Sequence, residues 1–332
     1  MKAAIYDRYG PADVLQIAEI ARPEIKDNEV LVQVYASSVT TADWRIRASA
    51  FPGYAWLPGR MMFGLFRPRN KVLGMEFAGR VVAKGNEVTR FRGGDAVFGF
   101  APRGAHAEYL AMPQDGPIML NPDNLSYEDA AAVPFGALSA LVFLRDFARV
   151  APGQKVLVHG ASGGIGIFAV QLAKHFGAEV TGVASGANLD LLRALGADHV
   201  IDYTQEDFTQ SARKWDLVFD TVGKTRFATV KRVLTETGIY LPLEFGFREI
   251  LLALVTSRGT GKRVKVGVSG DSSADLEMLA GLLKEGAIRP VIDSTYPLES
   301  IAEAYRRVEG RHKRGSVVVA VGQPQRQGST AA

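Results

Sequence analysis

The chain has 332 residues, of which 47% are hydrophobic and 22% charged, and its 39 basic and 35 acidic side chains give a formal net charge of +4. This length predicts about two domains with a sizeable core, and the small positive surplus favours small anionic ligands over a polyanionic partner. Cysteine is absent, which excludes disulfides, thiolate nucleophiles, iron–sulfur clusters and cysteine-ligated zinc. No secretory pattern precedes the first strand-like residues, so we expect a cytoplasmic protein.

The first part of the chain has the pattern of β structure. Residues 30–36 carry a partly alternating apolar pattern with β-branched side chains, and 79–82 and 95–98 indicate further short strands joined by Gly/Asn turns. The pattern changes near residues 121–123. The first 122 residues are therefore predicted to form a β domain.

After residue 123, predicted strands and helices alternate in short units. The predicted strands are 155–159, 179–184, 199–202, 216–222, 238–243 and 264–268, and the predicted helices are 165–176, 189–195, 225–234 and 274–285. This alternation predicts an α/β domain with a doubly wound parallel sheet. A helix at 298–308 and a strand at 317–321 follow, and the small, polar residues 323–332 are expected to be a disordered tail.

The most informative segment joins the strand at 155–159 to the helix that follows it. Glycines allow a tight turn there and let backbone amides approach a pyrophosphate, which the helix N-terminus attracts. Because a strand, a helix and a second strand complete the βαβ unit, the segment predicts a dinucleotide site rather than a simple tight turn. The candidate residues are Gly160, Ala161, Ser162, Gly163, Gly164, Ile165 and Gly166.

The same turn also satisfies G-x-S-x-G, the pattern of a nucleophilic serine in α/β-hydrolases. Asp220 and His312 follow Ser162 in the chain order that such a triad requires. No oxyanion-hole segment of the HGGG type precedes Ser162, so the hydrolase is the weaker alternative.

The end of the second strand of the unit decides between NAD and NADP. NAD sites place an acid there for the ribose hydroxyl, and this chain has Ser185 instead, which favours NADP(H). The candidates for the 2′-phosphate are Ser185, Asn188, Tyr203, Lys313 and Arg314. The alternatives are that Ser185 only forms a turn and that the two basic residues are a solvated pair.

Several motifs together identify a family. They are Tyr9-Gly10-Pro11, residues 27–32, residues 38–44, Gly74-Met75-Glu76-Phe77-Ala78-Gly79, residues 93–99, residues 130–134 and Leu195-Gly196-Ala197-Asp198. With these, the chain resembles the medium-chain dehydrogenase/reductase superfamily, specifically its zinc-free, quinone-oxidoreductase-like branch. The resemblance implies a GroES-like catalytic domain (1–122), a Rossmann domain that binds NADP (123–287) and a C-terminal return to the catalytic domain (288–322).

The resemblance also assigns site residues. Thr40 stands where the zinc branch has its first cysteine ligand and Met75 where that branch has a histidine, and the five histidines show no ligand spacing, so we expect no metal site. Thr40 and Asp43 match a pattern that quinone reductases place beside the nicotinamide, although Asp43 could equally cap a turn. Ser139 corresponds to a cofactor contact or to a helix-packing residue. Val222 follows the fourth strand at the expected crevice.

These observations predict an enzyme that transfers hydride from NADPH to a quinone or an α,β-unsaturated carbonyl without zinc. The alternatives are an NADP(H)-dependent alcohol or aldehyde oxidoreductase, a non-catalytic NADP binder and a nucleic-acid binder, the last without support from any binding motif. The substrate is expected to be small and apolar, no nucleic acid is expected, and the resemblance implies a homodimer.

Two apolar segments remain to be explained. Residues 51–66 are interpreted as a substrate lid, with the core of an inserted helix and a peripheral membrane contact as alternatives. Within this segment Tyr54 is a candidate proton donor. Residues 245–255 are interpreted as a pocket wall or a dimer contact.

Overall fold

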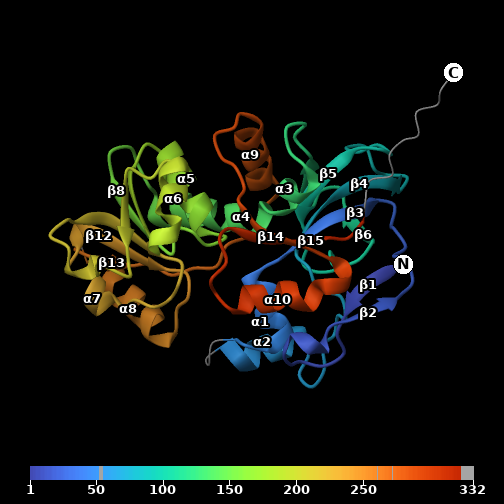
Figure 1. The fold of residues 1–332 in the computed structure, drawn as a ribbon, viewed down its shortest axis with the longest axis horizontal. Helices are drawn as coiled ribbons and strands as arrows, with labels where there is room; N and C mark the ends of the chain where they lie inside the picture. Colours follow the sequence, from blue (N-terminus) through green and yellow to red (C-terminus); the bar gives the residue numbers. More distant parts are fainter. Residues whose placement is uncertain (52–54, 260, 271, 323–332) are drawn as a thin grey trace.

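The computed structural model describes residues 1–51, 55–259, 261–270 and 272–322. Two large sheets stand side by side, one at each end of the long axis, and helices fill the space between and around them (Figure 1). Tyr54 and the tail 323–332 lie outside the described residues. In the described part, no helix is long and apolar enough to cross a membrane.

The first sheet is mostly antiparallel and is built around one long strand, β3. Its order is β14-β15-β3-β4-β5-β7, and β6 also pairs with β3. A separate pair, β1 and β2, is antiparallel. The strands of the N-terminal part are β1 (Lys2–Ile5), β2 (Gln16–Glu19), β3 (Glu29–Val39), β4 (Glu76–Lys84), β5 (Ala96–Phe100), β6 (Tyr109–Pro113) and β7 (Ile118–Leu120), and its helices are η1 (Ala12–Val14), α1 (Thr41–Ala48) and α2 (Trp56–Phe63).

The second sheet is parallel, with the order β10-β9-β8-β11-β12-β13. The strand order reverses between β8 and β11, the place where open α/β sheets bind ligands. Its strands are β8 (Lys155–His159), β9 (Glu179–Ala184), β10 (His199–Asp202), β11 (Trp215–Asp220), β12 (Leu234–Pro242) and β13 (Arg263–Val264). The helices are α3 (Tyr127–Ala131), α4 (Pro134–Val142), η3 (Phe143–Ala148), α5 (Gly166–His175), η4 (Gly186–Asn188), α6 (Leu189–Ala194), η5 (Phe208–Gln210), α7 (Phe227–Val230), α8 (Phe247–Ser257) and α9 (Ser273–Lys284).

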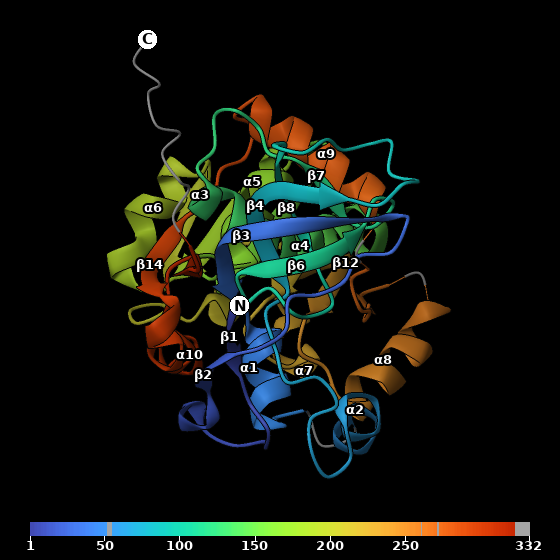
Figure 2. The same ribbon diagram turned by 90° about the vertical axis from the view of Figure 1, so that its right-hand side faces the viewer.

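The last elements join the first sheet, not the second. β15 (Ser316–Ala320) pairs antiparallel with β3, so that Val317 lies opposite Val39. β14 (Ile292–Pro297) pairs parallel with β15, and η6 (Leu298–Ser300) and α10 (Ile301–Glu309) connect the two. The C-terminal strands are thus seen next to β3 in two views (Figures 1 and 2).

The predicted strands 155–159, 179–184 and 199–202 have the same bounds in the structure, whereas one predicted helix is much shorter and one strand has no counterpart in the prediction. The predicted helix 225–234 is only α7, because the Val233 carbonyl accepts a hydrogen bond from the Trp215 amide at 2.8 Å and β12 begins at Leu234. β14 was not predicted, since Ile-Asp-Ser-Thr-Tyr-Pro is too polar to show an alternating pattern.

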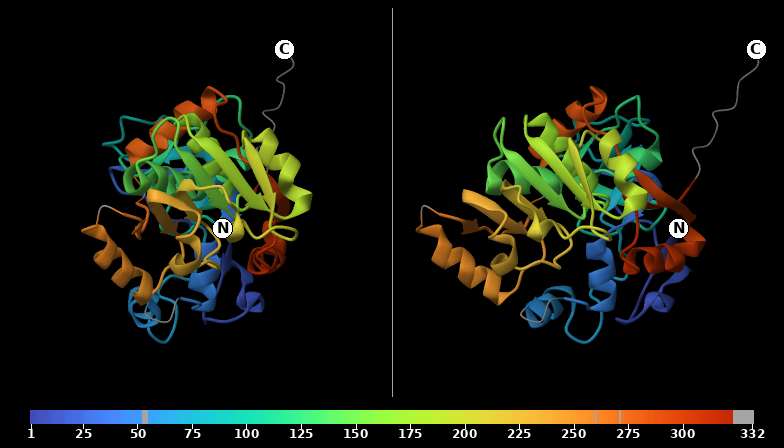
Figure 3. Two further views of the ribbon diagram at one scale, coloured as in Figure 1. Left: turned by 90° about the vertical axis from the view of Figure 1, so that its left-hand side faces the viewer. Right: turned by 60° about the vertical axis from the view of Figure 1, so that its left-hand side comes forward.

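Helices α4 and α5 form the centre of the core. Every α5 residue from Gly166 to Ala173 is buried, so this helix is covered on all sides. The one polar side chain between Gly166 and Ala173 is that of Gln171, and it is satisfied: its amide nitrogen donates to the carbonyls of Ile167 and Arg289, and its oxygen accepts from the Arg289 amide. The sheet and the helices that cover it can be seen from the opposite side in Figure 3.

A buried cation joins α1 to α10. The side chain of Arg47 is completely buried, forms an ion pair with Glu309 and lies over the Tyr305 ring, 5.2 Å from the ring centroid. The two other guanidinium nitrogens, Nε and Nη1, have no hydrogen-bond partner among the described residues. Glu309 therefore supplies most of the compensation for this buried charge.

We predict that Glu309→Gln lowers the free energy of unfolding by about 2 kcal/mol, because it leaves the Arg47 charge uncompensated. The loss is smaller than for a fully buried ion pair because Glu309 is partly exposed. The matched control is Glu299→Gln, which breaks an exposed pair with Lys2 and should change stability by less than about 0.5 kcal/mol. Urea unfolding of both variants measures the difference, and equal effects would contradict the role given to Glu309.

Candidate cofactor site

The glycine turn between β8 and α5 is so tight that several of its glycines leave no room for a Cβ. Gly160 has a φ of +78°. A Cβ on Gly166 would lie 2.2 Å from the Gly160 carbonyl oxygen, and a Cβ on Gly136 of α4 would lie 2.4 Å from the Gly164 carbonyl oxygen. The turn ends directly at the N-terminus of α5, where orphan amides and the helix dipole favour an anion. These residues fit a dinucleotide pyrophosphate.

The C-terminal segment closes on the same turn and brings a cation to it. The Gly315 amide donates to the Ser162 carbonyl at 2.8 Å. The ammonium of Lys313 is 2.8 Å from the point where a Cβ on Gly164 would stand. Burial lowers the pKa of Lys313 to about 8, against the opposing influence of the Glu76 carboxylate. Lys313 thus stands beside the turn, whereas Arg314 is exposed and its backbone amide donates to the Asp293 carboxylate.

The predicted 2′-phosphate residues Ser185, Asn188 and Tyr203 gather at the end of β9. The Asn188 amide donates to the Ser185 hydroxyl at 3.0 Å, and the Tyr203 amide donates to the Ala184 carbonyl at 3.1 Å. The structure adds an acid that sequence reasoning missed, since a Cβ on Gly186 would lie 2.6 Å from a carboxylate oxygen of Asp202. Asp202 ends β10, and its pairing with Ala184 of β9 brings it there. An acid at this place opposes binding of a 2′-phosphate, so the preference for NADP that Ser185 favours stays a prediction.

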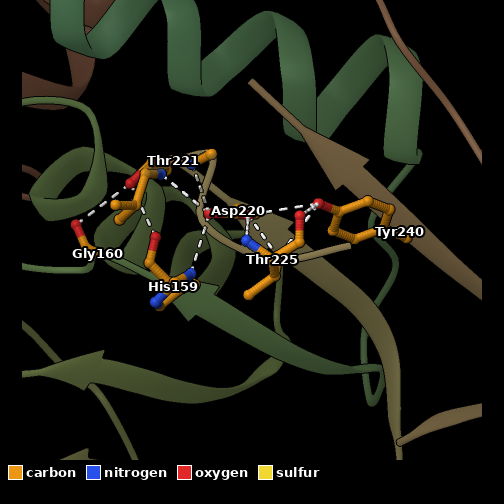
Figure 4. A network of polar contacts seen from close by, with 8 residues as sticks. His159, Gly160, Asp220, Thr221, Thr225 and Tyr240 are labelled. Atoms are coloured by element: carbon orange, nitrogen blue, oxygen red, sulfur yellow. Dashed lines mark hydrogen bonds and ion pairs between the residues drawn. The ribbon is translucent and has the colours of Figure 1, made fainter. Parts of the chain in front are cut away.

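A saturated hydrogen-bond network holds the turn after β11 (Figure 4). One carboxylate oxygen of Asp220 accepts from the amides of Val222 and Gly223, both at 3.0 Å, and from Nδ1 of His159 at 2.9 Å. Its other oxygen accepts from Thr225 and Tyr240. Burial by itself would raise the pKa of Asp220, but the hydrogen bond and charge of His159 hold it well below its usual range. The network fixes Val222 at the carboxyl edge of the sheet.

This network bears on the hydrolase alternative. The Asp220 carboxylate is engaged with His159, Thr225 and the backbone, and within the described residues it has no hydrogen bond to His312. His312 is exposed. The contacts therefore do not assemble the triad of Ser162, His312 and Asp220.

Thr40 and Asp43 form a capping box at the start of α1. The Asp43 amide donates to the Thr40 hydroxyl at 3.0 Å, and the Thr40 amide donates back to the Asp43 carboxylate at 2.9 Å. The second carboxylate oxygen accepts from the Gly74 amide at 3.0 Å. Burial raises the pKa of Asp43 to about 6, against these hydrogen bonds. Thr40 and Asp43 thus cap the N-terminus of α1, as the alternative interpretation of Asp43 expects. That either residue contacts a substrate stays a prediction.

Glu76, which the sequence analysis did not single out, connects the first sheet to helix α4. One carboxyl oxygen accepts from the Phe135 amide in the first turn of α4 at 2.6 Å, and the other accepts from the Ser38 hydroxyl of β3. Burial raises the pKa of Glu76 to about 7, and its hydrogen bonds with Ser38 and Phe135 oppose the change. Its place in the Gly74–Gly79 motif was the available signal.

The remaining candidates lie around this core. Ser139 is buried on α4, and its hydroxyl is 3.2 Å from that of Ser269. The C-terminal basic run is partly neutralised, because Arg306 pairs with Asp13 and Arg307 pairs with Asp293. This pairing leaves less free charge for the nucleic-acid alternative.

The donor set does not fit zinc. The Thr40 hydroxyl is used in the capping box, and Met75 offers a thioether where the zinc branch has a histidine. Among the described residues, no group of three or more His, Cys, Asp or Glu side chains is placed to hold a metal ion.

A parallel sheet with a glycine turn at its switch point, joined to an antiparallel domain whose C-terminal segment bridges that turn at Gly163, has the architecture of a dinucleotide-binding protein with a second domain. Two family models match: the alcohol dehydrogenase GroES-like domain over residues 26–123 and the zinc-binding dehydrogenase model over residues 195–319. The chain belongs to the medium-chain dehydrogenase/reductase superfamily, in its quinone-oxidoreductase-like branch.

Three relatives illustrate this membership. The chain is 33% identical to a 2-methylene-furan-3-one reductase of Solanum lycopersicum, over 96% of this chain and 79% of the relative. It is 32% identical to an NADPH-dependent alkenal/one oxidoreductase of Arabidopsis thaliana, over the same shares. The solved quinone oxidoreductase of Coxiella burnetii is 30% identical with a TM-score of 0.84, over 97% of this chain and 99% of that one. The predicted family and the α/β fold with GroES-like and Rossmann domains are confirmed.

We predict a pH-dependent stability from Glu76. Its pKa is about 7 in the folded protein against 4.5 for the free group, so the stability it contributes is full below about pH 4.5 and is lost as the pH rises through 7. The difference in free energy of unfolding, wild type minus Glu76→Gln, should fall by at most about 3 kcal/mol between pH 4.5 and pH 8.

Urea unfolding across this range measures the change, with exposed Glu206→Gln as the control that should show no such trend. A difference that is independent of pH would show that Glu76 titrates normally.

Proposed function

We propose that the chain is an NADPH-dependent reductase of quinones or α,β-unsaturated carbonyls that works without zinc. The observation that carries the proposal is that the chain combines a glycine turn that has Lys313 beside it with a donor set at Thr40 and Met75 that does not fit zinc. The names of the enone, alkenal and quinone reductases among its relatives point in the same direction.

The chain's own residues have three tasks in this proposal. The turn from Gly160 to Gly166 binds the pyrophosphate through backbone amides and the α5 dipole. Lys313 adds positive charge there. Asp220 positions Val222 and Gly223 at the carboxyl edge through its bonds to their amides. NADPH, when bound, supplies the hydride for the acceptor.

Reduction of an enone or a quinone suits such a site better than oxidation of an alcohol. Alcohol oxidation gains from a Lewis acid that stabilises the alkoxide, and the donors present do not provide a zinc site for one. A conjugated acceptor needs a hydride and a proton, and the proton can come from water, so the protein mainly positions the acceptor and excludes competing reactions. The homodimer and the domain bounds 1–122, 123–287 and 288–322 stay predictions.

The test is turnover. The purified chain should oxidise NADPH faster than NADH with members of a panel of quinones, enals and enones, and a chelator should leave the rates unchanged. Absence of turnover with every acceptor would refute the reductase. Loss of activity on chelation, restored by zinc, would instead refute its independence of zinc.

We further predict that two substitutions distinguish the pyrophosphate site from the site of the 2′-phosphate. Lys313→Gln should raise the KM for NADPH and for NADH equally, by about tenfold, because it removes a charge from the pyrophosphate that both cofactors share. Ser185→Asp should weaken NADPH alone, because a carboxylate repels the 2′-phosphate. A selective loss of NADPH in the Lys313 variant would move Lys313 to the 2′-phosphate, and unchanged NADPH affinity in the Ser185 variant would refute the placement of that group.

A further inference from the structure

Two helices of this protein are apolar but have no fully buried residue. They are α2, with the sequence Trp-Leu-Pro-Gly-Arg-Met-Met-Phe, and α8, with the sequence Phe-Arg-Glu-Ile-Leu-Leu-Ala-Leu-Val-Thr-Ser. Helices in a globular protein normally bury their apolar face against the core. The outer faces of these two helices are therefore not covered by the described part of the chain.

The exposed apolar side chains concentrate on these helices. Of the sixteen large hydrophobic residues exposed in the described chain, six lie in residues 56–66 and four on α8. Phe66 and Phe247 are the most exposed of these ten residues, at 85% and 73%. The ten exposed residues on the two helical segments are Trp56, Leu57, Met61, Met62, Leu65, Phe66, Phe247, Leu251, Leu254 and Val255. Such a concentration marks a contact surface.

One side of each helix contacts the rest of the protein, so the opposite side faces outward. Arg60 of α2 lies over the ring of Tyr9, 4.0 Å from the centroid, and the Tyr9 hydroxyl donates to the carbonyl of Gly64. On α8, Leu252 and Ala253 pack against the core of the parallel sheet. The exposed residues consequently point away from these contacts.

The two helices belong to different domains but stand at the same end of the molecule, as Figures 1 and 2 both show. An ion pair between Arg45 of α1 and Glu244, at 2.6 Å, joins the chain segments that lead into them. α2 follows α1, and α8 begins three residues after Glu244. One planar surface is thus able to contact both helices together.

The charge around these helices is positive and unpaired. Arg67 and Arg69 follow α2, and Arg248 and Arg258 lie on and directly after α8; all four are exposed. None of them forms an ion pair with the described residues. On the α2 side, the sequence has no acidic residue between Asp43 and Glu76. On the α8 side, Glu244 pairs with Arg45 and Arg311. Glu249 accepts a hydrogen bond from the Gly246 amide.

Aromatic and aliphatic side chains flanked by free arginines are the pattern of interfacial membrane helices. We propose that α2 and α8 together bind the surface of an anionic lipid bilayer, with their apolar side chains in the headgroup region and the four arginines against lipid phosphates. A second copy of the chain is a poorer occupant. A two-fold interface sets a patch against itself, so these unpaired arginines would face each other.

The test is co-sedimentation of the full chain with vesicles, without cofactor or acceptor, so that its outcome does not depend on the proposed reductase activity. The wild-type chain should bind vesicles of phosphatidylcholine with phosphatidylglycerol, should bind those of phosphatidylcholine alone at least fivefold more weakly, and should be released by high salt. Absence of binding to the anionic vesicles would overturn the proposal.

Two pairs of substitutions locate the surface. Met62→Ser with Phe66→Ser on the α2 side, and Leu254→Ser with Val255→Ser on α8, should each reduce the partition coefficient about tenfold, because each removes apolar area from the interface. The matched control is Val82→Ser with Leu120→Ser, which changes two exposed apolar residues of the first sheet and should leave binding unchanged. Equal losses in the control would overturn the location.

Arg67→Gln with Arg69→Gln should reduce binding at least fivefold, whereas Arg213→Gln, an exposed arginine elsewhere, should not. All substituted side chains are exposed, and circular dichroism verifies that each variant is folded. Light scattering in the absence of lipid measures the oligomeric state and so tests whether α2 and α8 instead contact a second copy of the chain. A homodimer that the α2 and α8 variants convert to monomer, together with lipid binding that they do not change, would assign these helices to the interface between copies and overturn the proposal.

Discussion

Close backbone approach at the glycine turn is the constraint on which the rest of the site depends. A Cβ on Gly136 of α4 would lie 2.4 Å from the Gly164 carbonyl oxygen, and a Cβ on Gly166 would lie 2.2 Å from the Gly160 carbonyl oxygen. Backbone therefore packs against backbone at the turn, and the hydrogen bond from the Gly315 amide to the Ser162 carbonyl brings the segment before β15 to the same place. The cation of Lys313 and the amides of α5 share the same small volume as a direct consequence, and a pyrophosphate is the anion that such a cradle fits.

Buried ionisable groups lie along the junction of the two sheets. Glu76 accepts from Ser38 of β3 and from the Phe135 amide of α4, and so connects the antiparallel sheet to the helices of the parallel one. Burial raises the pKa of this carboxyl, whereas Asp220, which is also buried, is held below its usual pKa by His159 and by a full set of donors. The difference is physical: the number and charge of the donors around each carboxylate decide which of the two opposing effects prevails.

The sequence determines the repeating parts of this fold well, because local patterns carry them. β8, β9 and β10 have the predicted bounds, and the turn from Gly160 to Gly166 is recognisable from its glycines and its βαβ context. Features that depend on contacts between strands were missed. β14 is too polar to show a strand pattern, Asp202 reaches Gly186 only through the pairing of β10 with β9, and Glu76 gains its role from α4, which is distant in sequence. Lys313 was singled out, but its place beside Gly164 rather than beside Ser185 required the structure.

The return of β15 to β3 has a consequence for biosynthesis. The edge of β3 that does not face β4 is shared: its first half pairs with β6, but residues Ala36–Val39 pair with β15, which begins at Ser316. This second half of the edge therefore stays unpaired until almost the whole chain has left the ribosome. The strands β8 to β13 and their helices are local in sequence and complete much earlier. Vectorial synthesis therefore favours an order in which the parallel sheet forms first, and the open β3 edge is the surface that needs protection from intermolecular pairing in the meantime.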